Sequence, residues 1–319
     1  MLNESFVPVA IDINVVMHQK DSEGEFFRHI AEQGHYAGKT KPSPTRQGLY
    51  VTGVDGDLLH SLNSTRSGHI LSLMSRGLSK WDKKQKASLK PLRDSNQADA
   101  RFVVKFPEGG LILRETMRDL PGKSNRRRDT KRHNFDHVWF TAEEKSHFIP
   151  KTVKQGETWQ VPSQTVKRLV AFHTVDQVHG EADPWEWEHV KDVSIKCRIS
   201  DIEGSKVAIT LVGHAKCMKG PSGETNPYNR RTVKESITND LTIRGKLVFD
   251  SKAKTFSSFR VLAAGNRSGA DLYNSRFEDM GPSPIGFAFE MLDSDTASQI
   301  KPKFLLWKYF WDEALDARR

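Results

Sequence analysis

Two short segments of the chain concentrate imidazole and carboxylate side chains, one over residues 133–137 and the other over 173–181. Such groups together suit zinc and similar ions, and they also form acid–base pairs. Convergence of the two segments would create a centre from Asp136, His137, His173 and Asp176, with Asp136 orienting a ligating imidazole through its second nitrogen. The spacing matches no established ligand signature, so the alternative is a set of polar loops that cap helices and strand ends. We predict no cofactor.

The run between residues 123 and 132 is strongly basic and raises the possibility of polyanion binding. Its cations are Lys123, Arg126, Arg127, Arg128, Lys131 and Arg132. Phosphate contacts need such a cluster, but base stacking also needs exposed aromatic side chains, and the run contains none. We therefore expect a solvated loop, with an acidic protein or a lipid surface as the next alternative, and we do not expect a nucleic acid as the partner.

The two cysteines, Cys197 and Cys217, lie too far apart to form a disulfide. If a turn brings Asp201 opposite Ser205, the two sulfurs are roughly 27 Å apart along the hairpin, whereas a disulfide needs Cα atoms within about 7 Å. We expect two buried, inert thiols. The chain also lacks a phosphate-binding loop, a dinucleotide fingerprint, a nucleophile elbow and a zinc-protease helix motif, so no motif favours an enzyme.

Composition is that of a globular chain long enough for two domains, with 319 residues and 36% hydrophobic content. The formal net charge of +9 favours association with anionic surfaces without specifying a partner. No run approaches the roughly 20 apolar residues that a membrane-spanning helix needs. We expect a cytoplasmic protein as the sequence is written, or an exported or periplasmic one if a leader precedes Met1.

The elements that would position the candidate residues lie in 101–319, which we predict to be a β-rich α+β domain. Helices are predicted to begin at Thr141 and at Ser163. Short strands are predicted over 102–106 and 111–115, and a terminal helix with four aromatic residues over 307–311. Alternating apolar residues then predict long strands over 193–199, 207–217, 241–249, 255–262 and 285–292. Antiparallel strands of this kind favour a curved meander or half-barrel, with the helix from Ser163 covering its concave face.

Residues 1–82 predict a smaller α/β module, followed by a basic linker over 83–100. A mostly apolar, β-branched segment over 7–16 predicts a strand buried on both faces. A capping box at Ser22 begins a helix, a hairpin follows over 47–62 around Asp55 and Gly56, and Ser64 or Ser67 caps a last helix.

This order, with three short motifs, resembles the C-terminal part of the thioredoxin-like superfamily. Residues 2–12 are similar to the stretch after the redox helix, Pro44 and Thr45 to the cis-proline and its threonine, and 54–58 to the turn of the last hairpin. The resemblance covers about a quarter of the chain. The gap between Pro44 and that turn is longer than the family norm. The half of the fold that carries the Cys-x-x-Cys dithiol is not in this sequence, so the resemblance implies an incomplete module without dithiol redox activity.

In a thioredoxin-like sheet the strand over 7–16 would lie between two strands that precede it in the chain. Its backbone groups would lack partners without them. We therefore expect an upstream segment, the second domain or another chain to complete the sheet.

A second resemblance covers the later part of the chain. Residues 134–139, 180–185 and 281–286 are similar to segments of uncharacterised bacterial proteins in which a thioredoxin-like module precedes a β-rich domain. This resemblance implies architecture and carries no established activity.

The predicted fold class is therefore α+β, with a partial thioredoxin-like module before an antiparallel β-rich domain. The leading functional hypothesis is a non-catalytic protein that binds an unknown protein or an apolar ligand. The alternatives are a thiol–disulfide oxidoreductase whose dithiol half lies upstream of Met1, and a polyanion-binding module.

Overall fold

A computed structural model describes the chain except residues 1, 12, 17–21, 36–45, 85–105, 123–131, 227–228, 293–300 and 305–319. The chain divides into two compact units, residues 1–104 and 105–319. Several predictions fall outside the described residues. These are Pro44, the terminal helix, the linker beyond Lys84, the strand over 102–106 apart from Phe106, and the basic run apart from Arg132, which is exposed.

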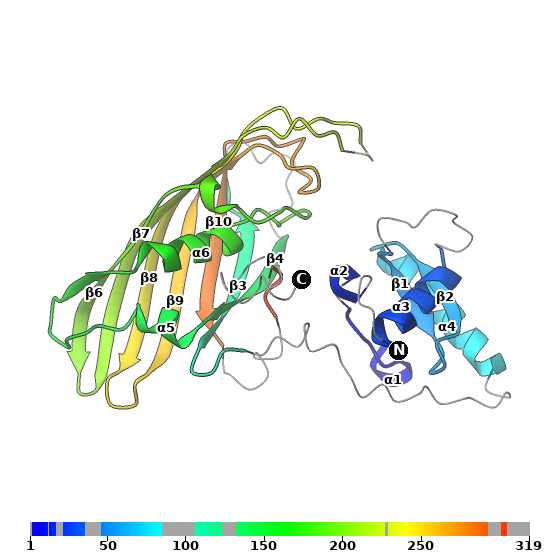
Figure 1. Cartoon of the computed structure of the whole chain (residues 1–319), viewed down its shortest axis with the longest axis horizontal. Coiled ribbons are helices and arrows are strands. Elements are labelled where there is room, and N and C mark those ends of the chain that lie inside the picture. Colours follow the sequence, from blue (N-terminus) through cyan, green and yellow to red (C-terminus); the bar gives the residue numbers. More distant parts are fainter. Residues whose placement is uncertain are drawn as a thin grey trace. The chain divides into compact units, whose positions relative to one another are not determined.

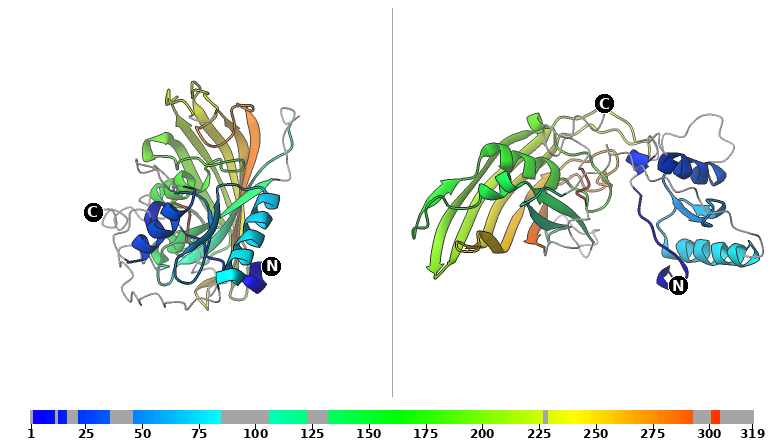
Figure 2. Two further views of the ribbon diagram at one scale, coloured as in Figure 1. Left: turned by 90° about the vertical axis from the view of Figure 1, so that its right-hand side faces the viewer. Right: turned by 60° about the horizontal axis from the view of Figure 1, so that its bottom comes forward.

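The first unit places a short hairpin between two helices (Figure 2). Helix α3 contributes Phe27 and Ala31 to a small core that also contains Val16. On the other side of the hairpin, α4 buries Leu73 and Met74. The predicted helix from Ser22, the hairpin and the last helix are confirmed. The elements are α1 (Leu2–Ser5), α2 (Ile13–Val16), α3 (Ser22–Gln33), β1 (Leu49–Thr52), β2 (Leu58–Leu62) and α4 (Ser67–Lys84).

The predicted strand over 7–16 is wrong. Residues 13–16 are helical and residues 6–11 belong to no strand. Val7 is 89% exposed and Val9 is 74% exposed. A β-branched segment becomes a buried strand only when neighbouring strands accept its backbone hydrogen bonds, and the described sheet of this unit contains β1 and β2 alone. The pattern of apolar residues is typical of a buried strand, but it does not show whether neighbouring strands are present to pair with it.

The second unit is built on an eight-stranded, fully antiparallel sheet in the order β4-β3-β10-β9-β8-β7-β6-β5 (Figure 1). Strands β5 to β10 form a meander, and the β3–β4 hairpin joins it at β10. The predicted antiparallel β-rich architecture is confirmed. The elements are β3 (Leu111–Asp119), β4 (His133–Phe140), α5 (Ala142–Ser146), β5 (Thr158–Gln160), α6 (Ser163–His173), η2 (Trp187–His189), β6 (Val190–Glu203), β7 (Lys206–Lys219), β8 (Ile237–Asp250), β9 (Thr255–Ser268) and β10 (Ser283–Met291).

Both predicted helix starts of this unit are found, although only one has the expected cap. Thr141 and Glu144 form a reciprocal capping box at the start of α5. At α6 the capping position belongs to Pro162, which makes no side-chain hydrogen bond, and Ser163 is already helical. The predicted capping role of Ser163 is therefore wrong by one position, because the fixed φ of proline suits the residues that begin a helix.

Helix α6 shows that the sheet curves around it. The helix contacts both β6 and β4, which are separated by five strands in the sheet. A flat sheet would place those strands about 29 Å apart, whereas a helix of 11 residues is about 16 Å long. The sheet must therefore bend toward the helix, as Figures 1 and 2 show. The apolar core lies between the concave face of the sheet and α6. Val166 and Val170 of the helix are buried in it.

Two glycines on the strands permit close approach of neighbouring backbones. A Cβ atom at Gly265 of β9 would collide with the carbonyl oxygen of Asp240 and lie 2.9 Å from the Cα of Leu241. A Cβ at Gly213 of β7 would collide with the carbonyl oxygen of Ser194 in the same way. Glycine in a strand marks such close approaches. Gly265 permits the approach of β9 to β8, and Gly213 permits that of β7 to β6.

We expect Gly265→Val to lower the free energy of unfolding by about 3 kcal/mol, because the added carbons overlap backbone that cannot move without breaking the ladder. Urea unfolding of the full chain measures this change. Gly220→Ala is the control, since nothing lies within 4 Å of the added carbon. Equal unfolding midpoints for the two variants would show that β8 and β9 do not approach in this way.

Candidate metal centre

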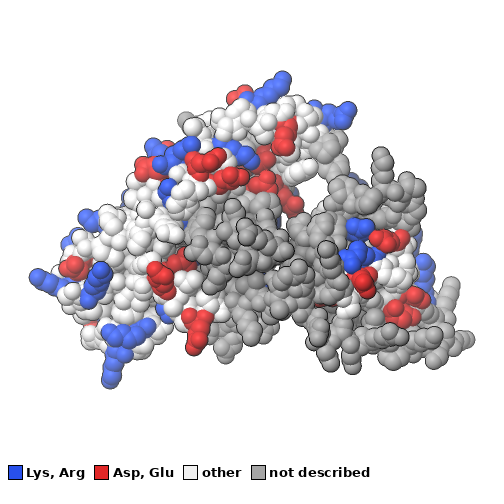
Figure 3. Space-filling model, in the orientation of Figure 1, with Lys and Arg blue, Asp and Glu red and all other residues white. Residues whose placement is uncertain are grey.

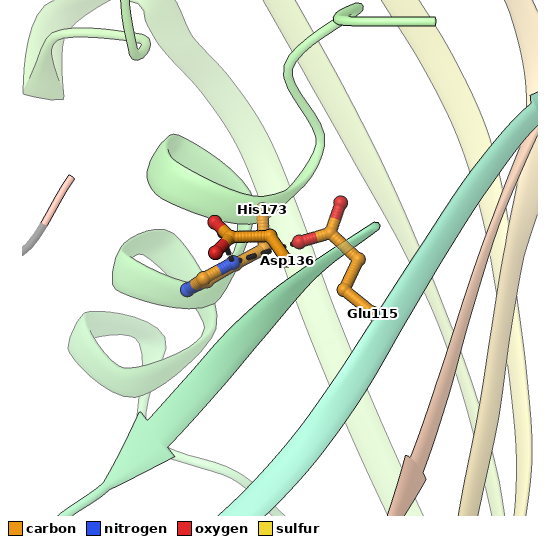
Figure 4. A group of neighbouring side chains, drawn as sticks. All are labelled: Glu115, Asp136 and His173. Carbon is orange, nitrogen blue, oxygen red and sulfur yellow. Dashed lines mark hydrogen bonds and ion pairs between the residues drawn. The ribbon is translucent and has the colours of Figure 1, made fainter. Parts of the chain in front are cut away.

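Three buried ionisable side chains meet where β3, β4 and α6 come together (Figure 4). Glu115 of β3 lies directly opposite Asp136 of β4 in the antiparallel ladder, so both side chains leave the same face of the sheet. His173 is the last residue of α6, which lies against that face. One ligand atom of each residue lies within 4.8 Å of the other two.

The imidazole of His173 is the shared contact of the two carboxyl groups. Its Nδ1 atom lies 2.8 Å from Oε2 of Glu115 and 3.7 Å from Oδ2 of Asp136. The other oxygen of Asp136 accepts backbone N–H groups of His137 at 2.7 Å and of Lys303 at 2.9 Å. Oε1 of Glu115 is buried and has no hydrogen-bond partner among the described residues.

Burial shifts the pKa of each member away from the charged form. The pKa of Glu115 is raised well above its ordinary value, first by burial and then by the neighbouring Asp136, while Lys303 opposes the shift. Burial also raises the pKa of Asp136 to about 6, although the two backbone N–H groups favour its ionised form. The pKa of His173 is lowered well below its ordinary value by burial, and then by Arg168 and His137. These shifts favour the protonated form of Glu115 and the neutral form of His173, while a pKa of about 6 leaves Asp136 mostly ionised at neutral pH.

The structure brings together only two of the four residues predicted to form a centre, which were Asp136, His137, His173 and Asp176. Asp136 and His173 meet, but His137 follows Asp136 on β4, points to the other face and lies opposite Arg114. Burial, and then Arg114, lowers the pKa of His137. Asp136 and Glu115 face the same nitrogen of His173, and the predicted role of Asp136 in orienting an imidazole through its second nitrogen stays a prediction.

Glu115 was not predicted, although the sequence carries a signal for it. Along β3 the residues that point inward are Leu111, Leu113, Glu115, Met117 and Asp119, all of them buried. Two acidic residues in an otherwise apolar alternation indicate carboxyl groups with a partner or a function inside the fold. Each of the two belongs to a different buried polar cluster.

The second cluster is an ion network centred on the buried Arg276, and it contains the predicted residue Asp176. Arg276 donates to both oxygens of Asp119 at 2.9 and 3.0 Å and to both oxygens of Asp176 at 2.6 Å. Arg267 contacts Asp176 and Asp279, and His179 lies 2.7 Å from Asp119. Asp176 therefore balances guanidinium charge and is not available to the Glu115 cluster.

The two cysteines are free and buried, as predicted. The register differs from the expected one, because β6 and β7 join at Glu203 and Lys206 and β6 bulges between Ile199 and Asp201. Cys197 therefore lies opposite Leu211, six residues from Cys217, which is about 20 Å along the strand. Burial raises the pKa of each thiol to about 12, which keeps both thiols protonated and unreactive.

Comparisons with known proteins leave the chain without a matching relative. No protein-family model, curated protein or solved structure matches it. The thioredoxin-like assignment and the bacterial resemblance therefore stay predictions. Among the described helices, none is long and apolar enough to cross a membrane.

We expect Arg276→Met to lower the free energy of unfolding by about 3 to 5 kcal/mol, because it leaves the buried Asp119 and Asp176 without their shared cation. Arg231→Met removes an arginine from an exposed ion pair with Glu278 and should cost about 0 to 1 kcal/mol. Chemical denaturation of both variants measures the difference. Similar losses would mean that the network does not hold buried charge.

The protonation of Glu115 predicts a pH dependence of stability in the metal-free chain. The unfolded chain ionises this residue near its ordinary pKa of 4.5, whereas the folded chain keeps it protonated to a higher pH. As pH rises above about 4.5, the unfolded state binds fewer protons, so the free energy of unfolding falls until the folded carboxyl also ionises. Glu115→Gln has no carboxyl group at this position, so its free energy of unfolding should not show this decrease with pH.

Relative to the wild type, Glu115→Gln should gain about 1.4 kcal/mol in unfolding free energy for each pH unit above that point. Urea unfolding in the presence of a chelator, from mildly acid to mildly alkaline buffer, measures the gain. Glu290→Gln alters an exposed carboxyl and serves as the control. A constant difference between Glu115→Gln and the wild type at every pH would refute the raised pKa.

Proposed function

We propose that the second unit binds one divalent transition-metal ion through Glu115, Asp136 and His173. The observation that supports this proposal is the convergence of three buried ligand atoms from three elements, one carboxyl retaining an oxygen without a partner in the described residues. An ion held at about 2.0 to 2.2 Å has ligand atoms about 3 to 4 Å from one another. The contacts of 2.8 and 3.7 Å to His173 require only small adjustments to reach that geometry.

The charges of the cluster favour a divalent cation. Two ionised carboxylates and a neutral imidazole carry a charge of minus two, so a divalent ion would leave the buried centre neutral. Without an ion, burial protonates Glu115 instead. Binding would therefore release the proton of Glu115, and the affinity should increase with pH.

The ligand types narrow the choice of metal. Imidazole suits zinc, iron, copper and nickel, whereas carboxylates also suit manganese. Three protein ligands leave at least one position open in a tetrahedral site, and zinc in such a site lowers the pKa of a bound water. We therefore favour zinc as the first metal to test and manganese as the second.

The earlier functional predictions stand beside this one as proposals. A protein partner or an apolar ligand is the alternative for this unit, but its inner face is already packed against the apolar residues of α6, which favours a small ion over a bulky apolar molecule. Both cysteines lie in the second unit with raised pKa values. The oxidoreductase alternative would thus depend entirely on a dithiol outside this sequence.

Calorimetric titration of the chelator-treated full chain with Zn²⁺ should give one site per chain. Glu115→Gln and His173→Gln should each weaken binding at least about tenfold, because each removes a ligand. In buffers of different ionisation enthalpy, the titration should report proton release that is lost in Glu115→Gln. His137→Gln is the matched control on the adjacent position of β4 and should bind as the wild type does. Binding that survives in both ligand variants would place the metal elsewhere and overturn the proposal.

A further inference from the structure

The outer face of the large sheet carries a cluster of cations that the buried centre does not use. Apart from Asn239 and Arg267, the buried inward positions of β6 to β9 are apolar, and the alternate positions point outward. We call the outer basic face the exposed residues Lys196, Arg198, Arg244, Lys246 and Arg260, together with Val212 and Leu262.

Strand register gathers these residues in two adjacent rows. One row across β6, β7, β8 and β9 reads Arg198, Thr210, Lys246 and Arg260. The neighbouring row reads Lys196, Val212, Arg244 and Leu262. Strands lie about 4.8 Å apart and successive same-face residues of one strand about 7 Å apart, so each charge lies within about one Debye length of its nearest neighbours and their fields add.

Acidic residues are absent from both rows. The first row continues onto β10 with Glu290, which lies opposite Arg260 and contacts it at 3.6 Å, so the carboxylate is at the margin of the face. Asp192 and Asp240 lie farther along the strands, where they contact His214 and Lys216 respectively. By contrast, on the helix-bearing side of this unit Lys and Arg lie beside Asp and Glu along its upper edge (Figure 3).

The apolar residues of the outer basic face favour a lipid surface over a nucleic acid as its anionic partner. Val212 is 53% exposed and Leu262 is 50% exposed, and they flank Arg244 in one row. Aliphatic side chains among cations gain free energy at the boundary between headgroups and acyl chains. A nucleic acid would instead call for stacking aromatics, and no outward position of β6 to β9, all of which are described, holds Phe, Tyr or Trp.

We propose that the outer basic face binds a membrane surface rich in anionic phospholipid, through electrostatic attraction to the headgroups and shallow contact of Val212 and Leu262. Each cation near such a surface contributes about a fivefold increase in partitioning. This binding would be peripheral and would weaken as salt is added. It is independent of the metal centre, which lies on the opposite face of the sheet.

Co-sedimentation of the full chain with vesicles of phosphatidylcholine, with and without phosphatidylglycerol, tests the proposal. We expect binding only to the anionic vesicles, with loss at high salt. The double variant Arg244→Glu with Lys246→Glu should bind at least about 25-fold more weakly. The control, Lys151→Glu with Lys154→Glu, makes the same change in net charge at exposed loop positions and should lose less than about threefold. Thermal unfolding verifies that all variants fold.

A neutral variant tests the choice of lipid over other polyanions. Val212→Ser with Leu262→Ser should weaken vesicle binding while leaving binding to a single-stranded oligonucleotide unchanged. The proposal is overturned if phosphatidylcholine vesicles bind equally well, if the loop control loses as much binding as the face variant, or if the serine variant binds vesicles like the wild type.

Discussion

The enclosure of α6 by one curved sheet is the constraint on which the second unit depends. A helix surrounded by protein loses water on nearly all sides, so its polar groups must find partners within the fold. Arg168 of α6 donates to Glu144 and to the carbonyl oxygen of Trp139. Beyond the helix end, the carbonyl oxygen of Thr174 accepts from Asn239 and Trp185. These bonds join the helix to α5, to β4, to β8 and to the following loop.

Two polar clusters arise near the C-terminal end of α6 because the inward stripe of β3 meets it there. The two clusters differ in how the charge of their buried carboxyl groups is neutralised. At Asp119 and Asp176 a guanidinium supplies the counter-charge, with hydrogen bonds to all four carboxylate oxygens. At Glu115 no described guanidinium contacts the carboxyl, so burial favours its protonated form. A network satisfied by its own cations is structural, whereas a carboxyl kept neutral only by a proton can exchange that proton for a metal ion.

The two faces of the sheet therefore have different chemistry. Inside, two polar clusters lie within apolar packing, one of them neutralised by arginine. Outside, cations in adjacent rows face solvent without carboxylates between them. Because strand alternation assigns neighbouring residues to opposite faces, a single strand contributes to both faces, as β3 does with Glu115 inward and Arg114 outward.

The sequence by itself determined most of the long strands and helices of the second unit, because they depend on residues close together in the chain, but it did not predict β4 or β5. Alternation predicted the long strands, and the capping residues Thr141 and Ser163 predicted the starts of α5 and α6. The same reasoning failed over residues 7–16, since a strand also requires neighbours that local pattern cannot report. Only the tertiary structure decided that β3 pairs with β4, which brings Glu115 opposite Asp136, and that Asp176 turns to Arg276 and away from His173. The reason is physical: periodicity is a property of successive residues, whereas the partner and protonation state of a buried charge depend on pairings between segments far apart in sequence.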